Sequence, residues 1–240
     1  MESLITSASK SKGFHLISTV KIQMESKSKK IANFKSKMPS IKTTTPILGG
    51  NYYHIFNRGI NSQKIFFTED NYHYFLKLLN KYLVSHISII SFVLLPGHFH
   101  LVIKVNDSIK GIPPSDDITG ESEVGNYVSE QFRRMFIAYS MAINKQEKRT
   151  SSLLDKNFKR IEITEHEYLQ YCIFYVHFNP EKHGYTTNFK NYKFSSYLTY
   201  LSNKKTQIAR QLGLDIFVDL ESFVNYHNVW HDEKDDYLLE

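Results

Sequence analysis

The alternation of apolar and polar residues along this chain predicts a folded region that begins near residue 50. The segment NYYHIFNR (51–58) is aromatic and β-branched, which is typical of a strand, and Gly59 and Asn61 mark a turn after it. In residues 69–84 apolar side chains recur at helical spacing behind an acidic first turn. The first two predicted elements are therefore a strand and an amphipathic helix.

Two further strand-like runs follow that helix. The runs are HISIISFVLL (86–95) and HFHLVIKV (98–105), and only Pro96 and Gly97 separate them. Such a short turn between two strands predicts an antiparallel hairpin or a close pair. The next segment, NDSIKGIPPSDDITGESE (106–123), has the Pro, Gly, Asp and Ser content of a loop.

A long helix and a last strand are predicted after this loop. Residues 124–145 place apolar side chains on one side and Arg133 and Arg134 on the other, as an amphipathic helix does. A basic connector, KRTSSLLDKNFKRIEI (148–163), ends in FKRIEI, whose alternating pattern predicts a strand.

The final helix of the folded region is predicted over residues 165–178. Thr164 and Glu167 have the spacing of a capping box at its start, and the helix is expected to end near Asn179 and Pro180. The element order is then strand, helix, two strands, helix, strand, helix. This order predicts an α+β fold, a ferredoxin-like sandwich in which helices back an antiparallel β-sheet.

Composition divides the chain into three parts: a basic arm (1–48), the main domain (49–200) and a C-terminal helical tail (201–240). The arm holds nine lysines against two glutamates, a balance of +7, and its Lys, Ser and Thr content predicts disorder. It is either a nonspecific DNA-binding arm or an upstream extension without function, with Met24 or Met38 as the start. The tail is expected to form short helices that either pack on the domain or reach DNA.

The composition also limits the cellular setting. The single cysteine, Cys172, excludes an internal disulfide framework and a multi-cysteine zinc site, which suits a reducing cytosol. No apolar run approaches 18 residues, and the first residues lack the pattern of a secretion signal. We therefore expect a cytoplasmic protein with no membrane association.

Candidate chemistry lies at the start of the second hairpin strand. Side chains alternate along a strand, so His98 and His100 point the same way and Phe99, Leu101 and Ile103 take the opposite side. Two neutral imidazoles on one face can bind a metal and leave open positions for a substrate. The alternative is a pair of histidines on the solvated face of an amphipathic strand.

A second group of polar side chains lies on the last helix. Tyr175 and Asn179 are four residues apart and share a face, whereas His177 is rotated by about 200° from Tyr175 and faces elsewhere. The alternative is structural, because Tyr168, Tyr171 and Tyr175 also form a stripe suited to an aromatic core.

Four segments together resemble a known family. They are YYHIFNRGINSQKIF (52–66), LPGHFH (95–100), YVHFNPEKHGY (175–185) and YKFSSY (192–197), and they span roughly residues 50–200. Their order and spacing resemble the REP-associated tyrosine transposases, which belong to the HUH single-tyrosine superfamily.

The resemblance implies a bacterial enzyme that cleaves and rejoins single-stranded DNA near hairpins. It implies that His98, His100 and Asn179 hold Mg²⁺ or Mn²⁺. It also implies that the last helix is the catalytic one, on which Tyr175 attacks the backbone and leaves a 5′-phosphotyrosine and a free 3′-OH. It also implies a monomer or a homodimer. The sequence departs from the family at Gly97, where asparagine is frequent, and in the basic connector.

Six side chains are candidates for DNA contact in the main domain: Asn57, Arg58, Arg133, Arg134, Lys159 and Arg160. Ordinary surface solvation is an alternative for each of them. Three other functions remain open at the level of sequence. The protein could bind hairpins as a regulator without cutting, act as a nuclease in which the metal activates water, or serve as a partner-binding domain without metal.

Overall fold

The computed structural model describes residues 44–110 and 123–232, which lie in one compact unit. The predicted arm (1–48) therefore falls almost entirely outside the described residues, and so does most of the predicted loop (106–123).

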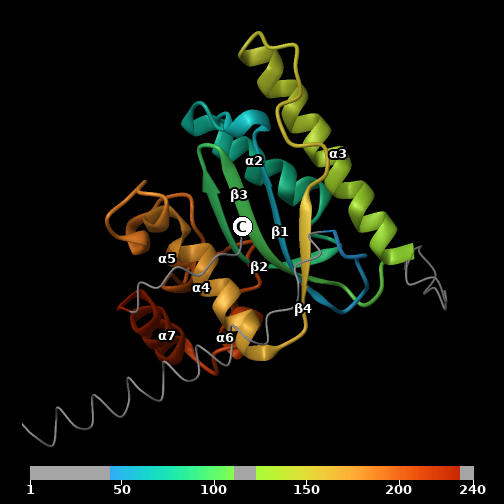
Figure 1. The fold of residues 1–240 in the computed structure, drawn as a ribbon. Coiled ribbons are helices and arrows are strands. Elements are labelled where there is room, and N and C mark those ends of the chain that lie inside the picture. The colour runs from blue at the N-terminus through green and yellow to red at the C-terminus, as the bar shows by residue number, and fades with distance from the viewer. Residues whose placement is uncertain (1–43, 111–122, 233–240) are drawn as a thin grey trace, which may run out of the picture. The chain divides into compact units, whose positions relative to one another are not determined.

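The described elements follow the predicted order (Figure 1). In chain order they are β1 (Tyr52–Arg58), α2 (Glu69–Tyr82), β2 (Ile87–Leu95), β3 (His98–Val105), α3 (Glu123–Gln146), β4 (Lys159–Ile163), α4 (His166–Lys182), α5 (Tyr197–Tyr200), α6 (Arg210–Asp215) and α7 (Leu220–Asp232). Among the helices that the structure describes, none is long and apolar enough to cross a membrane.

The four strands form one sheet in the order β2-β3-β1-β4, and every pair of neighbours is antiparallel. β2 and β3 make the predicted hairpin, and β1 pairs with β3 so that Arg58 stands opposite His98. β4 adds to the other edge of β1. The predicted fold class is thus confirmed, because this strand order with two strand–helix–strand halves is the ferredoxin-like arrangement.

Helices cover both faces of the sheet (Figure 1). On one face the ring of Phe99 lies 4.9 Å from Phe75 of α2 and 5.6 Å from Phe136 of α3. On the other face α4 lies against β2 and β3. Phe75 and Phe99 are fully buried, and removing such rings from water stabilises the fold by about 1.5–3 kcal/mol each. Because both faces are covered, β3 is buried except at His98 and Lys104, which are half-buried.

Both ends of α4 differ from the prediction. Glu165, not Thr164, precedes the first helical turn, and it makes no side-chain cap, so the predicted capping box with Glu167 is wrong. At the other end the helix continues through Pro180 to Lys182. Proline in the last turn removes only one backbone hydrogen bond, so the helix tolerates it there.

The C-terminal helices pack on the domain through a buried chain of hydrogen bonds. Phe92 N donates to Ser196 Oγ (2.9 Å), which lies 2.7 Å from His177 Nε2. His177 Nδ1 lies 2.9 Å from His227 Nε2 of α7, and His227 Nδ1 lies 2.8 Å from the carbonyl oxygen of Phe223. Each hydrogen bond in this series can form with both imidazoles neutral. The described part of the predicted tail therefore packs against α4.

Candidate metal and tyrosine site

The two histidines of β3 lie on the face that α4 covers. Their ring centroids are 5.2 Å apart and the rings are perpendicular. His100 is 1 % exposed, and His98, at the first position of the strand, is half-buried. The alternative of two histidines on a solvated strand face is excluded by this burial.

A third histidine, which the sequence analysis did not single out, joins them from β1. The Nε2 of His54 lies 2.9 Å from the Nδ1 of His100, and the two rings stack with centroids 5.1 Å apart. His54 is completely buried and also stacks on Phe56. Strand alternation puts His54 and Phe56 on one face of β1. Only the register of β1 with β3, which pairs Phe56 with His100, brings that face to the site.

Helix α4 brings the predicted amide and phenol to the same histidines. The Oδ1 of Asn179 lies 3.1 Å from the Nε2 of His98. The ring of Tyr175 meets those of His100 and His54 edge to face, with centroids 5.8 and 6.1 Å away. All four predicted residues of the site therefore meet in one place, together with His54.

Two further side chains reach the site because α4 runs past its proline. The Nζ of Lys182 lies 3.2 Å from the Oη of Tyr175 and 4.9 Å from the centroid of its ring. His183, the residue that ends the helix, places its ring 4.8 Å from that of His98. Lys182 is seven residues after Tyr175, so the two side chains lie on one face of the helix, two turns apart.

The site is closed on most sides. Tyr175 is 1 % exposed and Asn179 is fully buried, whereas Lys182 is half-buried and His183 is exposed. The spacing of the two histidines on one strand face predicted open positions beside them. The structure leaves the edge formed by Lys182 and His183 as the side nearest to solvent.

One distance among the candidate metal ligands fits a hard divalent cation. Within residues 44–110 and 123–232, no three His, Cys, Asp or Glu side chains converge as ligands. The candidate set is instead two imidazoles and one amide oxygen. Adjacent ligands of an octahedral Mg²⁺ at about 2.1 Å stand about 3 Å apart, and His98 Nε2 and Asn179 Oδ1 are 3.1 Å apart. Among the described residues, the buried Nδ2 of Asn179 has no partner.

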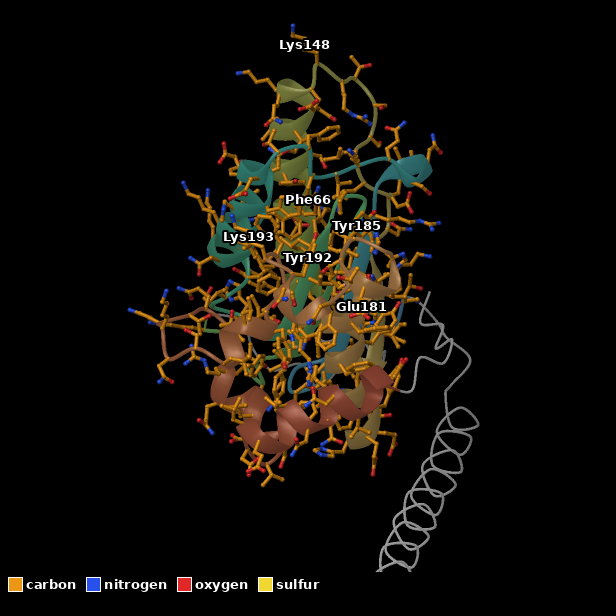
Figure 2. The ribbon with its side chains drawn as sticks, turned by 90° about the vertical axis from the view of Figure 1, so that its left-hand side faces the viewer. Phe66, Lys148, Glu181, Tyr185, Tyr192 and Lys193 are labelled. Carbon is orange, nitrogen blue, oxygen red and sulfur yellow. The ribbon has the colours of Figure 1, made fainter. Side chains whose placement is uncertain are left out.

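The YKFSSY segment supports this end of the sheet from the side of β2. The Oη of Tyr192 donates to the carbonyl oxygen of Leu94 (3.0 Å), and Leu94 N donates to the carbonyl oxygen of Phe194 (2.9 Å). In the view of Figure 2 Tyr192 lies between Lys193 and Tyr185, and burial, followed by the neighbouring Tyr72, raises the pKa of Tyr192. Leu94 is one residue before the strand position opposite His98. These bonds hold the segment against β2, so we assign the motif a structural role at the β2–β3 hairpin.

Two other polar side chains of α4 take no part in the site. His177 contacts Ser196 and His227 and so faces away from the site, as its rotation from Tyr175 predicted. Cys172 is fully buried, and this burial raises the pKa of its thiol. A protonated, inaccessible thiol is neither a metal ligand nor a nucleophile.

Three of the six predicted DNA contacts lie on the face of the sheet opposite the histidines. Asn57, Arg133 and Arg160 line a groove beside α3. Asn57 is buried, and its Nδ2 donates to the carbonyl oxygen of Asp155 (3.1 Å). Arg160 Nε donates to the carbonyl oxygen of Thr45 (2.5 Å).

The other three predicted contacts lie elsewhere. Arg58 pairs with Asp155 at 3.2 Å at the end of β1. Arg134 is exposed and pairs with Glu130. Hydrogen bonds from Arg133 and Arg134 lower the pKa of the Glu130 carboxyl to about 2. Lys159 stands opposite Phe56 in the sheet and so belongs to the histidine face. The six residues do not form one patch.

Comparison with known proteins finds neighbours among solved structures alone. No protein-family model and no curated protein matches the sequence. One similar structure is a REP-associated tyrosine transposase bound to a REP hairpin, with a TM-score of 0.48, 18 % identity, and coverage of 69 % of this chain and 87 % of that chain. Another is a candidate transposase from Deinococcus radiodurans R1, with a TM-score of 0.28, 14 % identity, and coverage of 56 % and 92 %. The first carries the name of the family that the four sequence motifs resemble.

Proposed function

We propose that this protein is a metal-dependent strand transferase that cleaves single-stranded DNA beside a hairpin. Tyr175 is the nucleophile, and the intermediate is a 5′-phosphotyrosine. One observation supports this best: α4 sets the Tyr175 ring against His100 while Asn179, one turn later on the same helix, reaches His98. A phenol beside a candidate metal site is what a tyrosine nucleophile requires.

The covalent step exchanges one phosphate ester for another. The Oη of Tyr175 bonds to phosphorus, and the bond from phosphorus to the 3′ oxygen breaks. The phenol loses one proton, and the 3′ oxygen gains one and leaves as a 3′-OH. The ammonium of Lys182, 3.2 Å from that Oη, offsets the negative charge that develops as the phenol loses its proton. Because the ester is conserved, the 3′-OH can reverse the step and rejoin strands.

His98, His100 and Asn179 are the residues that would hold Mg²⁺ or Mn²⁺. A cation bound there would act as a Lewis acid on a nonbridging phosphate oxygen. Two imidazoles also accept zinc or nickel. His54 orients His100: when His100 Nδ1 donates to His54 Nε2, the Nε2 of His100 carries the lone pair that a metal needs.

The burial of Tyr175 sets the route by which DNA approaches. A phosphate comes from the side of Lys182 and His183, which is the part of the site nearest to solvent. The same burial favours a second candidate function, a hairpin-binding regulator that does not cut, because a tyrosine that is only 1 % exposed also suits a structural role.

Incubation with labelled hairpin oligonucleotides that carry single-stranded flanks separates these functions. The purified protein is mixed with the DNA in Mg²⁺ or Mn²⁺, and in chelator, and resolved under denaturing conditions. Tyr175→Phe is compared with Tyr171→Phe, a matched loss of a buried hydroxyl one turn earlier on α4. We expect a metal-dependent covalent band that only Tyr175→Phe abolishes.

The other outcomes have defined meanings. Cleavage that survives in Tyr175→Phe, with free 5′-phosphate ends and no attached protein, would assign a nuclease in which the metal activates water. Hairpin binding without any cutting by the unaltered protein would assign the regulator.

A further inference from the structure

An open groove runs between α3 and the connector that leads from α3 to β4. Its volume is about 750 Å³, within the range of roughly 300–1,000 Å³ for pockets that hold small ligands. Figure 1 shows the connector returning along α3 to β4. Asn57 and Arg160, which line the groove, alternate along their strands with Phe56 and Lys159 of the histidine face. The groove is therefore separate from the tyrosine site. We call it the α3 groove.

The charges of the α3 groove favour an anion. Arg133, Lys156 and Arg160 line it, together with two carboxylates, Glu130 and Asp155. Both carboxylates are already paired with arginines: Glu130 with two guanidinium groups of α3 at 2.6 and 2.9 Å, and Asp155 with one at the end of β1 at 3.2 Å. Cations thus exceed carboxylates around the groove, as at a surface that binds phosphates.

One wall of the groove adds an exposed apolar stripe beside these cations. Arg133, Ile137 and Met141 recur every four residues and so lie along one face of α3. Ile137 is 44 % exposed and Met141 is 68 % exposed. Apolar side chains pack against aromatic rings, and a thioether makes favourable contacts with them. A ligand that carries both phosphates and accessible rings matches this combination.

We propose that the α3 groove binds an unpaired segment of DNA, with its phosphates at Arg133, Lys156 and Arg160 and its bases against Ile137 and Met141. The bases must be unpaired because the ring faces of a duplex are stacked on one another and closed to side chains. The choice of DNA rests on the proposed function. Binding in the groove itself needs no chemistry at Tyr175.

The position of the groove relates it to the tyrosine site. Asp155 lines the groove and pairs with Arg58, and Arg58 stands opposite His98 in the β1–β3 ladder. The groove and the metal-site histidines therefore lie at the same end of the sheet, on its two faces. A strand that crosses this end at Arg58 can occupy both sites, so the groove holds the single-stranded flank of a substrate whose cleavage point is at Tyr175.

The test measures DNA binding in a background that cannot form the covalent intermediate. Every protein carries Tyr175→Phe, and the anisotropy of a fluorescent oligothymidylate reports affinity over a series of salt concentrations. Lys156→Glu and Met141→Glu alter exposed groove residues. The matched control, Lys145→Glu, makes the same charge change as Lys156→Glu at an exposed position of α3 outside the groove. Thermal unfolding verifies that all variants fold.

We expect each groove variant to weaken binding about tenfold, while the control stays within about twofold. Lys156→Glu should also flatten the salt dependence by about one unit of slope. Equal weakening by Lys145→Glu would overturn the proposal, because it would indicate a nonspecific surface charge effect. Unchanged binding in both groove variants would also overturn the proposal and would favour a protein partner for the apolar stripe. The same measurement is made with a duplex of oligothymidylate and oligodeoxyadenylate, and an equal loss of affinity for this duplex would overturn the proposal as well.

This result is independent of cleavage by the unaltered protein. Weakened binding in the groove variants together with no covalent band would retain the groove and reject the strand transferase. A covalent band together with unchanged binding in the groove variants would support the strand transferase and reject the groove.

Discussion

The Nζ of Lys182 lies 3.2 Å from the Oη of Tyr175, across two turns of the same helix. Its ammonium also lies 4.9 Å from the centroid of the phenol ring. The contact exists because α4 does not end at Pro180, where the sequence predicted its termination. A cation against a buried phenol oxygen both positions the hydroxyl and favours its loss of a proton.

Lys182→Met should therefore slow the formation of the covalent intermediate by about 100-fold. Lys182→Arg, which retains the charge, should recover much of this loss. Single-turnover assays at saturating DNA separate the rate of the covalent step from affinity, which we expect to change less. Lys193→Met, which breaks a surface pair with Glu69, is the control and should remain within about twofold of the unaltered protein. A Lys182→Met enzyme with an unaltered covalent rate would remove Lys182 from the mechanism.

His54→Phe should weaken Mn²⁺ binding by about 10- to 100-fold, as is usual when the hydrogen-bond partner of a metal-binding histidine is lost. The phenyl ring retains the stacking on Phe56 but loses the bond to His100 Nδ1. Titration of Mn²⁺ followed by electron paramagnetic resonance gives the affinity without any need for DNA. The same loss in His73→Phe, at an exposed position of α2, would show that the effect is unspecific.

Strand alternation was enough to predict that His98 and His100 share a face, because it depends only on local geometry. The contribution of His54 was not predictable in this way. Its place depends on β1 pairing with β3 in the register that sets Phe56 opposite His100, and packing over the whole sheet determines that register.

The C-terminal end of α4 was predicted wrongly for a physical reason. Pro180 was read as a helix terminator, yet in the last turn it costs one backbone hydrogen bond, and packing against β2 and β3 outweighs that loss. Lys182 was missed as a result. The α3 groove could not be predicted from the sequence either, because Asn57, Arg133 and Arg160 come from three separate elements. The contact between Asn179 and His98 was expected only from the resemblance to a family.

The buried histidine pair predicts a loss of stability in mild acid. Burial lowers the pKa of His227 to about 3, and burial together with His227 lowers the pKa of His177 well below its ordinary value of 6.5. The unfolded chain therefore takes up protons below about pH 6.5 that the folded chain refuses until near pH 3, and the free energy of unfolding falls across this window.

For His227 alone the loss is about 2 kcal/mol between pH 7 and pH 5. Urea unfolding at the two pH values measures it, and His227→Gln should reduce the difference by about that amount. His73→Gln, at an exposed site, should leave the difference unchanged. Identical pH dependence in His227→Gln and the unaltered protein would contradict the buried, neutral pair.

Two glycines near His98 should respond differently to alanine. A Cβ at Gly59 would come within 2.1 Å of the carbonyl oxygen of Gln63, whereas a Cβ at Gly97 would lie 3.6 Å from the same atom. We expect Gly59→Ala to lower the free energy of unfolding by about 1–3 kcal/mol and Gly97→Ala to change it by less than about 0.5 kcal/mol. Denaturant titration of both variants tests the predicted close approach after β1.

The most direct test of the central claim is to locate the DNA-linked residue in the covalent complex. The protein is reacted with a cleavable hairpin oligonucleotide in Mg²⁺, digested with nuclease and trypsin, and sequenced by tandem mass spectrometry. Trypsin leaves Tyr168, Tyr171 and Tyr175 on one peptide between Arg160 and Lys182, so fragmentation distinguishes them internally. We predict a nucleotide phosphate on Tyr175 alone. An adduct on another residue, or cleaved DNA with no adduct on this peptide, would contradict the assignment of Tyr175 as the nucleophile.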